Sequence, residues 1–177
     1  MSSDFTDFNP VSRITIDTVG QPGARVFLLQ ASRGTTLITL KMEKEQVRVL
    51  AASILELLEE LEKENPGSTS HLDEPLSADL LLQEPIDPAF AVGQIGLGYE
   101  RSEDMIVMVI QEVQTEDKTE LATARFWATR AQMKALSQHA LEVVEQGRPI
   151  CPLCNTPMDP EGHFCPKQNG HDKVEWD

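Results

Sequence analysis

The chain has 177 residues, and its 29 acidic and 15 basic side chains give a formal net charge of −14. This balance argues against a nucleic-acid backbone or an anionic membrane surface as the main partner, because each of them requires a positive patch. Hydrophobic residues make up 40% of the chain, close to the average of soluble globular domains. No apolar run approaches the roughly 18 residues of a membrane span, and the first ten residues lack a signal-peptide pattern. We therefore expect a soluble cytoplasmic protein.

The first part of the chain predicts three strands followed by a helix. Residues 13–17 and 35–42 alternate between apolar and polar side chains, residues 25–30 form a denser apolar run, and glycine-containing turns separate the three. This pattern predicts an antiparallel meander. From Glu43 to Glu64 the apolar residues recur at helical spacing, and Asn-Pro-Gly at 65–67 ends the predicted helix.

A proline-containing acidic stretch, residues 65–89, separates this part from the next. Between positions 65 and 104 there are eight acidic residues and a single basic one, Arg101. A charge run of this kind usually forms a solvated loop. The alternative is a face that repels nucleic acid or recruits a basic partner.

The pattern then repeats. Residues 90–99, 105–113 and 121–127 are β-like, and an amphipathic helix is predicted from Thr129, its N-cap, to Gln146. A shift of 86 residues aligns the two helices, placing Gln46 on Gln132 and Leu50 on Leu136. The sequence therefore predicts a duplicated β-β-β-α unit with halves of about 1–64 and 90–148. Chance is the alternative explanation, because amphipathic helices resemble one another.

The three cysteines all lie near the C-terminus and suggest a metal site. Cys151 and Cys154 form a C-x2-C pair, and His163 and Cys165 follow after a turn rich in proline and glycine. Three thiolates and one imidazole suit zinc, and four protein ligands complete a structural, tetrahedral site with no position for water. A redox C-x-x-C is a poorer interpretation, because that motif favours a helix N-terminus.

The choice of the fourth ligand stays open. The spacing H-x-C places one residue between two ligands where zinc ribbons usually have two, and His171 follows shortly after Cys165. The predicted set is Cys151, Cys154, His163 and Cys165, with His171 as the alternative to His163 or Cys165.

The sequence thus predicts an α+β fold. Residues 1–148 form the duplicated domain, with antiparallel strands in one or two sheets and both helices on one side, and residues 149–177 form a zinc-ribbon-like segment. Gly93, Gly96 and Gly98 do not match a nucleotide-binding loop, and we expect them to shape a strand. His139 has no visible partner in the sequence, and no nucleophile motif occurs.

Several strings of residues resemble a known family. They are EPIDPAFAVGQIGLGYE (84–100), ARFWATRAQ (124–132) and GRPICPLCNTPMDPEGHFCP (147–166). The chain resembles an uncharacterised bacterial family, best known from actinobacteria and filed as a domain of unknown function. The resemblance implies that Cys151, Cys154, His163 and Cys165 are the matching positions and that a tyrosine often stands at position 171. It also implies genes near a histidine-type phosphatase and the cysteine ligase of mycothiol synthesis, and so a thiol- or phosphate-linked process.

Three classes of function remain. The first is a non-enzymatic interaction or regulatory protein that binds an unidentified protein partner, which the lack of catalytic motifs favours. The second is a nucleic-acid binder, for which Arg13, Arg25, Arg33, Lys41 and Lys44 are the only dense basic residues. The third is an enzyme whose acidic residues the sequence does not locate.

Overall fold

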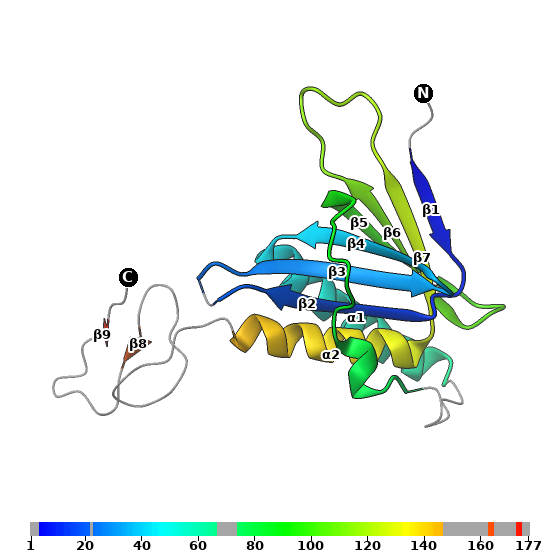
Figure 1. Ribbon diagram of the computed structural model, residues 1–177. Helices are drawn as coiled ribbons and strands as arrows, with labels where there is room; N and C mark the ends of the chain where they lie inside the picture. The colour runs from blue at the N-terminus through cyan, green and yellow to red at the C-terminus, as the bar shows by residue number, and fades with distance from the viewer. Residues whose placement is uncertain (1–3, 22, 67–73, 147–162, 165–172, 175–177) are drawn as a thin grey trace.

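The computed structural model of the protein describes residues 4–21, 23–66, 74–146, 163–164 and 173–174. Within these residues a seven-stranded sheet packs with two α-helices (Figure 1). The strands of the sheet are β1 (Phe5–Phe8), β2 (Arg13–Val19), β3 (Val26–Arg33), β4 (Thr36–Met42), β5 (Phe90–Glu100), β6 (Met105–Glu112) and β7 (Thr123–Ala128). The remaining elements are α1 (Lys44–Glu64), a 3-10 turn η2 (Ser77–Leu80), α2 (Arg130–Gln146), and the short pair β8 (His163–Phe164) and β9 (Lys173–Val174).

The sheet consists of two antiparallel meanders joined side by side. Its strand order is β1-β7-β6-β5-β4-β3-β2. β4 and β5 pair in parallel, with Leu40 opposite Phe90, and β7 pairs in parallel with β1, with Phe126 opposite Phe8. The α+β class predicted from the sequence is confirmed. The sequence did not predict β1 or the two parallel pairings.

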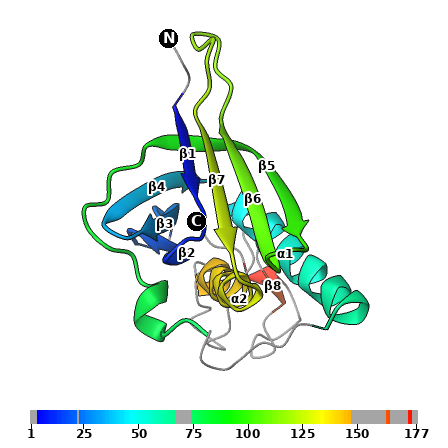
Figure 2. The ribbon, with the colours of Figure 1, turned by 90° about the vertical axis from the view of Figure 1, so that its right-hand side faces the viewer.

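The sheet curls so that its two ends meet (Figure 2). β1 and β2 are consecutive in the chain, although they stand at opposite ends of the strand order. Between them, the Val11 amide donates to Trp127 O of β7 (2.8 Å) and the Ser12 amide donates to Ser32 O of β3 (2.7 Å). The segment between β1 and β2 therefore connects the two meanders at the ends of the strand order, as the β4–β5 pairing connects them in the middle.

One hydrophobic core lies on the inner side of the curled sheet and includes both meanders and both helices. Its fully buried residues include Ile16 and Leu40 from the first meander and Phe126 from the second. Ile54 of α1 and Met133 of α2 complete it at the helical spacing that the sequence predicted. Burying each of these side chains contributes about 1.5–3 kcal/mol.

Both helices begin with the same arrangement. The Glu43 amide donates to Gln46 Oε1 and the Thr129 amide donates to Gln132 Oε1, each at 2.9 Å. The Gln132 amide in turn donates to Thr129 Oγ1 at 3.1 Å, so the predicted N-cap is present. These bonds satisfy amides that have no partner within the helix.

The acidic linker does not form a free loop over its described part, residues 74–89. Arg13 Nη1 donates to the backbone oxygens of Asp79 (3.2 Å) and Leu81 (3.1 Å). Thr15 Oγ1 donates to Leu80 O, and Gln30 exchanges two hydrogen bonds with the backbone of Gln83. These polar side chains stand on the outer face of β2 and β3, so the linker covers that face. Most side chains of residues 74–89, including Glu84 and Asp87, are nevertheless exposed, in keeping with the solvated segment that the sequence predicts.

Candidate functional site

The predicted zinc ligands lie largely outside the described residues. Cys151, Cys154 and Cys165 lie there, as does the alternative ligand His171. His163 begins β8, where its backbone pairs with Val174 of β9. Among the residues that the structure does describe, no group of three or more His, Cys, Asp or Glu side chains could hold a metal. The zinc site therefore stays a prediction.

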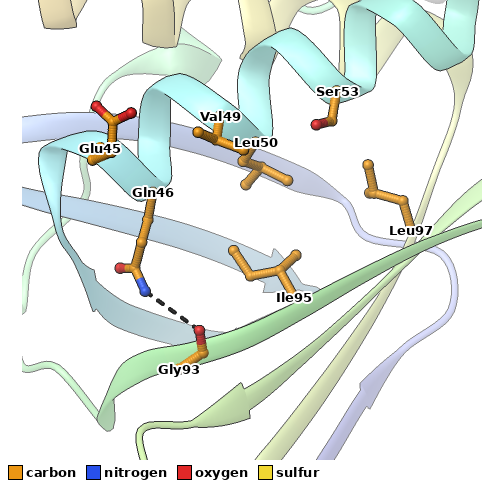
Figure 3. A pocket seen from close by; sticks show the side chains of 8 residues that line it. All are labelled: Glu45, Gln46, Val49, Leu50, Ser53, Gly93, Ile95 and Leu97. Atoms are coloured by element: carbon orange, nitrogen blue, oxygen red, sulfur yellow. Dashed lines mark hydrogen bonds between the residues drawn. The ribbon is translucent and has the colours of Figure 1, made fainter.

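An open groove runs between the first half of α1 and the middle of β5 (Figure 3). Its cavity volume is about 320 Å³. Ile95 and Leu97 of β5 face α1, and Val49 and Leu50 face them from the helix. Its full lining is Glu45, Gln46, Val49, Leu50, Ser53, Gly93, Ile95 and Leu97. The groove is therefore lined mainly by apolar side chains, and its polar side chains (Glu45, Gln46 and Ser53) all come from α1.

A local irregularity in β5 forms one end of this groove. The pairing with β6 shifts its register between Val92 and Gln94. A Cβ on Gly93 would stand 2.7 Å from the Cα of Val113, so only glycine allows this close approach of the two backbones. Gln46 Nε2 donates to Val92 O at 2.9 Å and to Gly93 O at 3.4 Å, which holds the start of α1 against the bulge.

A buried arginine fixes the other end of α1. Arg130 Nε donates to Asp104 Oδ1 (2.8 Å), and Nη2 donates to Asn65 O (2.8 Å) and Tyr99 OH (3.2 Å). The Tyr99 hydroxyl donates to Asp104 Oδ1 at 2.7 Å. Asp104 adopts a φ of +52°, a conformation that non-glycine residues seldom take. This network joins the end of α1, the β5–β6 turn and the start of α2, and we assign it a structural role.

The corresponding place between α2 and β2 is closed. Ile14 and Ile16 of β2 are 3% and 0% exposed, whereas Ile95 and Leu97 of β5 are only partly buried. α2 packs directly on β2, and a smaller cavity of about 160 Å³ near the start of α2 is lined in part by Pro75, Asp79 and Gln132. The two helix–strand layers therefore differ in how closely the helix packs on the strand.

The outer face of the second meander is also uncovered. Phe5 of β1 and Val109 of β6 are 58% and 40% exposed. Gly96 and Gly98 of β5 have no atom within 4 Å of the place where a Cβ would stand. Cross-strand pairing places Val107 and Trp127 in one row with Gly98. We call Phe5, Gly96, Gly98, Val107, Val109 and Trp127 the open face.

Arg125 is the charged residue at the centre of this face. Its guanidinium carbon lies 5.5 Å from the ring centroid of Phe5 and 5.4 Å from that of Trp127. It also pairs with Asp7, whose oxygens lie 2.8 and 3.1 Å away. The hydrogen bond with Arg125 holds the pKa of the Asp7 carboxyl below its usual value. The charge is thus neutralised locally, and the remaining surface is flat and apolar.

The basic residues proposed for nucleic-acid binding are largely engaged in the fold. Arg13 is 6% exposed and donates to the linker backbone. Arg25 Nη2 donates to Val143 O at 2.6 Å, and Arg33 Nη1 donates to Pro10 O at 2.8 Å. Arg33, Lys41 and Lys44 are exposed, so the nucleic-acid alternative stays a prediction.

His139 has a partner that the sequence did not reveal. Its Nε2 lies 3.3 Å from Asp17 Oδ2 of β2. The hydrogen bond to Asp17 raises the pKa of His139 above its ordinary value. Burial raises the pKa of Asp17, but the hydrogen bonds from His139 and from the Thr18 amide outweigh it, so that the net pKa is lowered. Among the described residues this pair contacts no nucleophile. We assign the pair a structural role in the packing of α2 on β2.

Comparison with known proteins gives one match. A model of the family described as "Protein of unknown function (DUF3090)" matches residues 6–165. No curated protein and no solved structure matches the chain. The resemblance to a family of unknown function is thereby confirmed, while the expected genomic neighbours stay predictions. Neither helix of the described residues is long and apolar enough to cross a bilayer.

Proposed function

Because the chain belongs to the DUF3090 family, whose description states no activity, we propose a function from its own chemistry: a non-enzymatic interaction protein that carries a structural zinc site. The observation that carries the proposal is the open face. Contiguous exposed apolar surface on a soluble domain commonly marks a protein–protein contact. The partner is a protein that presents an apolar surface, since the exposed side chains of Phe5 and Val109 are apolar.

Zinc belongs to the C-terminal segment in this proposal. Cys151, Cys154, His163 and Cys165 supply three thiolates and an imidazole, the donors that zinc prefers. A metal held by four protein ligands has no free position for water, so its contribution is to fold the segment. Bound zinc leaves this site with a net charge of about −1, and acid should release the metal.

Elemental analysis of the purified protein tests the zinc site. We expect one zinc ion per chain, with a lower content in Cys154→Ala and His163→Ala and an unchanged content in the control His171→Ala. Loss of zinc in the His171 variant alone would show that His171, and not His163, is the zinc ligand. Metal-free wild-type protein, purified reduced and without chelator, would contradict the site.

Affinity capture tests the open face. The native protein should retain a protein partner, and Val109→Glu should lose it because the new carboxylate would have to be desolvated in the contact. Leu76→Glu is the matched control, since Leu76 is 72% exposed on the linker, away from that face. Equal recovery of the partner with both variants would contradict the proposal.

Nucleic-acid binding and an enzyme linked to thiol or phosphate metabolism are the alternative functions. On the proposed function, unstructured DNA or RNA binds no more tightly than the non-specific range of about 10⁻⁴–10⁻⁶ M. A salt-sensitive submicromolar complex in an anisotropy assay would favour the nucleic-acid alternative. A small molecule recovered with the native protein by mass spectrometry would favour the enzyme.

The internal duplication belongs to the same proposal. Its support is the shared order of three strands and a helix, the equivalent glutamines Gln46 and Gln132, and the equivalent parallel pairs Leu40–Phe90 and Phe126–Phe8. An experimental structure in which the two halves superimpose strand on strand and helix on helix is the expected result. Different strand paths in the halves would reduce the 86-residue similarity to chance.

A further inference from the structure

We propose that the groove between α1 and β5 is the docking site of the chain's own C-terminal segment, residues 147–177. The inference does not depend on the identity of a partner protein. It rests on where α2 ends, on the length of the chain that follows α2, and on the chemistry of the groove.

The end of α2 lies at the same end of the molecule as the start of α1 (Figure 1). Arg25, just before β3, donates to Val143 O in the last turn of α2. The next residues along β3 pair with the end of β4, where Phe27 stands opposite Met42. α1 follows Met42 almost directly, and its first turns line the groove. The chain that leaves α2 therefore starts beside the groove.

The length of this segment is sufficient to enter the groove. Residues 147–162 alone can extend over roughly 50 Å at about 3.3 Å per residue. The lining residues of α1, from Glu45 to Ser53, occupy roughly 12 Å of helix. Attachment to the same chain also gives the segment an effective concentration of about millimolar, which favours it over a free competitor.

The chemistry of both surfaces agrees. The groove presents Val49, Leu50, Ile95 and Leu97. The C-terminal segment offers Ile150, Leu153, Met158 and Phe164, with prolines that resemble those of the linker. Docking of these side chains would remove apolar surface from water on both sides.

Site-specific photo-crosslinking in the full chain tests the proposal. p-Benzoylphenylalanine at Val49 should crosslink to a peptide within residues 147–177 of the same chain, so the product keeps the mass of one chain. The same group at Glu59, which does not line the groove and is 72% exposed at its side chain, should not. A product of two chains, a crosslink to another region only, or no crosslink at Val49 would overturn the inference.

Limited proteolysis gives a second, independent readout. Val49→Asp should raise the rate of tryptic cleavage after Lys167 at least about tenfold, because an unpaired buried carboxylate costs more than the 1.4 kcal/mol that tenfold represents. Ala52→Asp, which adds the same charge at an exposed position outside the lining, should leave the rate unchanged. Equal rates in both variants and the wild type, with unchanged helical content, would overturn the inference.

Discussion

Each antiparallel meander is followed by a helix, but the outer faces of the two meanders carry different side chains. In the first, one cross-strand row consists of Thr15, Gln30 and Thr39. In the second, the row that contains Arg125, 86 residues after Thr39, consists of Gly96, Val109 and Arg125. The first row is buried beneath the linker, whereas Val109 and Gly96 of the second are exposed.

The difference shows how polar side chains on a strand can bind the backbone of a segment that forms no strand or long helix itself. Gln30 is fully buried, accepts from Arg13 Nη2 and the Gln83 amide, and donates to Thr39 Oγ1 and Gln83 O. Each buried polar atom needs such a partner, and the linker backbone supplies several. In the second row Gly96 and Val109 offer no such bonds, and Arg125 is paired with Asp7 of β1, so this face binds no comparable segment among the described residues.

The largest expected effect comes from breaking the covered face. Arg13→Met removes the donor to the carbonyls of Asp79 and Leu81 and leaves them in a partly buried place. We expect a loss of about 3 kcal/mol in the free energy of unfolding. Arg125→Met on the open face should cost at most about 1 kcal/mol, since its pair with Asp7 is partly exposed. Urea denaturation measures both, and equal losses would contradict the comparison.

A second test compares two glycines of β5. Gly93→Ala places a Cβ against the backbone of Glu112 and Val113, so we expect a loss of about 2 kcal/mol from overpacking. Gly96→Ala meets no neighbour and should change the free energy of unfolding by less than about 1 kcal/mol. Thermal denaturation of both variants is the measurement. A tolerated Gly93→Ala would show that the bulge does not require glycine.

The equivalent helix starts allow a smaller, symmetrical test. Gln46→Ala and Gln132→Ala each remove one acceptor for an N-terminal amide and one donor to a backbone carbonyl, that of Val92 for Gln46 and that of Val11 for Gln132. We expect each to lower the free energy of unfolding by about 1 kcal/mol. Chemical denaturation of the two variants should give similar losses. A clear effect of only one would show that the helix starts are not equivalent in energy.

The smallest expected effect is a pH dependence of stability that comes from the Asp17–His139 pair. The second meander has Gly98, which carries no charge, in the cross-strand row that a shift of 86 residues aligns with the row of Asp17. The raised pKa of His139 adds stability below about pH 6.5 that is lost as the pH rises through the folded pKa. The lowered pKa of Asp17 adds stability above about pH 4 that is lost as the pH falls. The pair should therefore contribute most between about pH 4 and 6.5.

His139→Gln provides the measurement for this pair. It should remove a contribution of about 0.5 kcal/mol at pH 5.5 and change little at pH 8, because a partly exposed ion pair is weak. Urea denaturation at both pH values compares the variant with the wild type. An equal loss at pH 5.5 and 8 would attribute the effect to packing instead of charge.

Much of the secondary structure could be predicted from the sequence. Six of the seven strands of the sheet and both helices lie close to their predicted residues, because periodicity and turn residues are local signals. β1 escaped prediction since its four residues are too short to show a period, and its parallel partner β7 lies more than a hundred residues away. The zinc ligands were predicted from spacing alone and stay a prediction.

The amino-acid sequence by itself determined where strands, helices and turns begin and end, because these depend on neighbours within a few residues. Only the tertiary structure decided what those elements face. The side chains of the acidic, proline-containing stretch are mostly exposed, as the sequence predicts, but only the fold shows that Arg13 and Gln30 bind its backbone. His139 showed no partner until folding placed it beside Asp17. Whether α1 closes on β5 as α2 closes on β2 depends on contacts between distant segments, which no local pattern encodes.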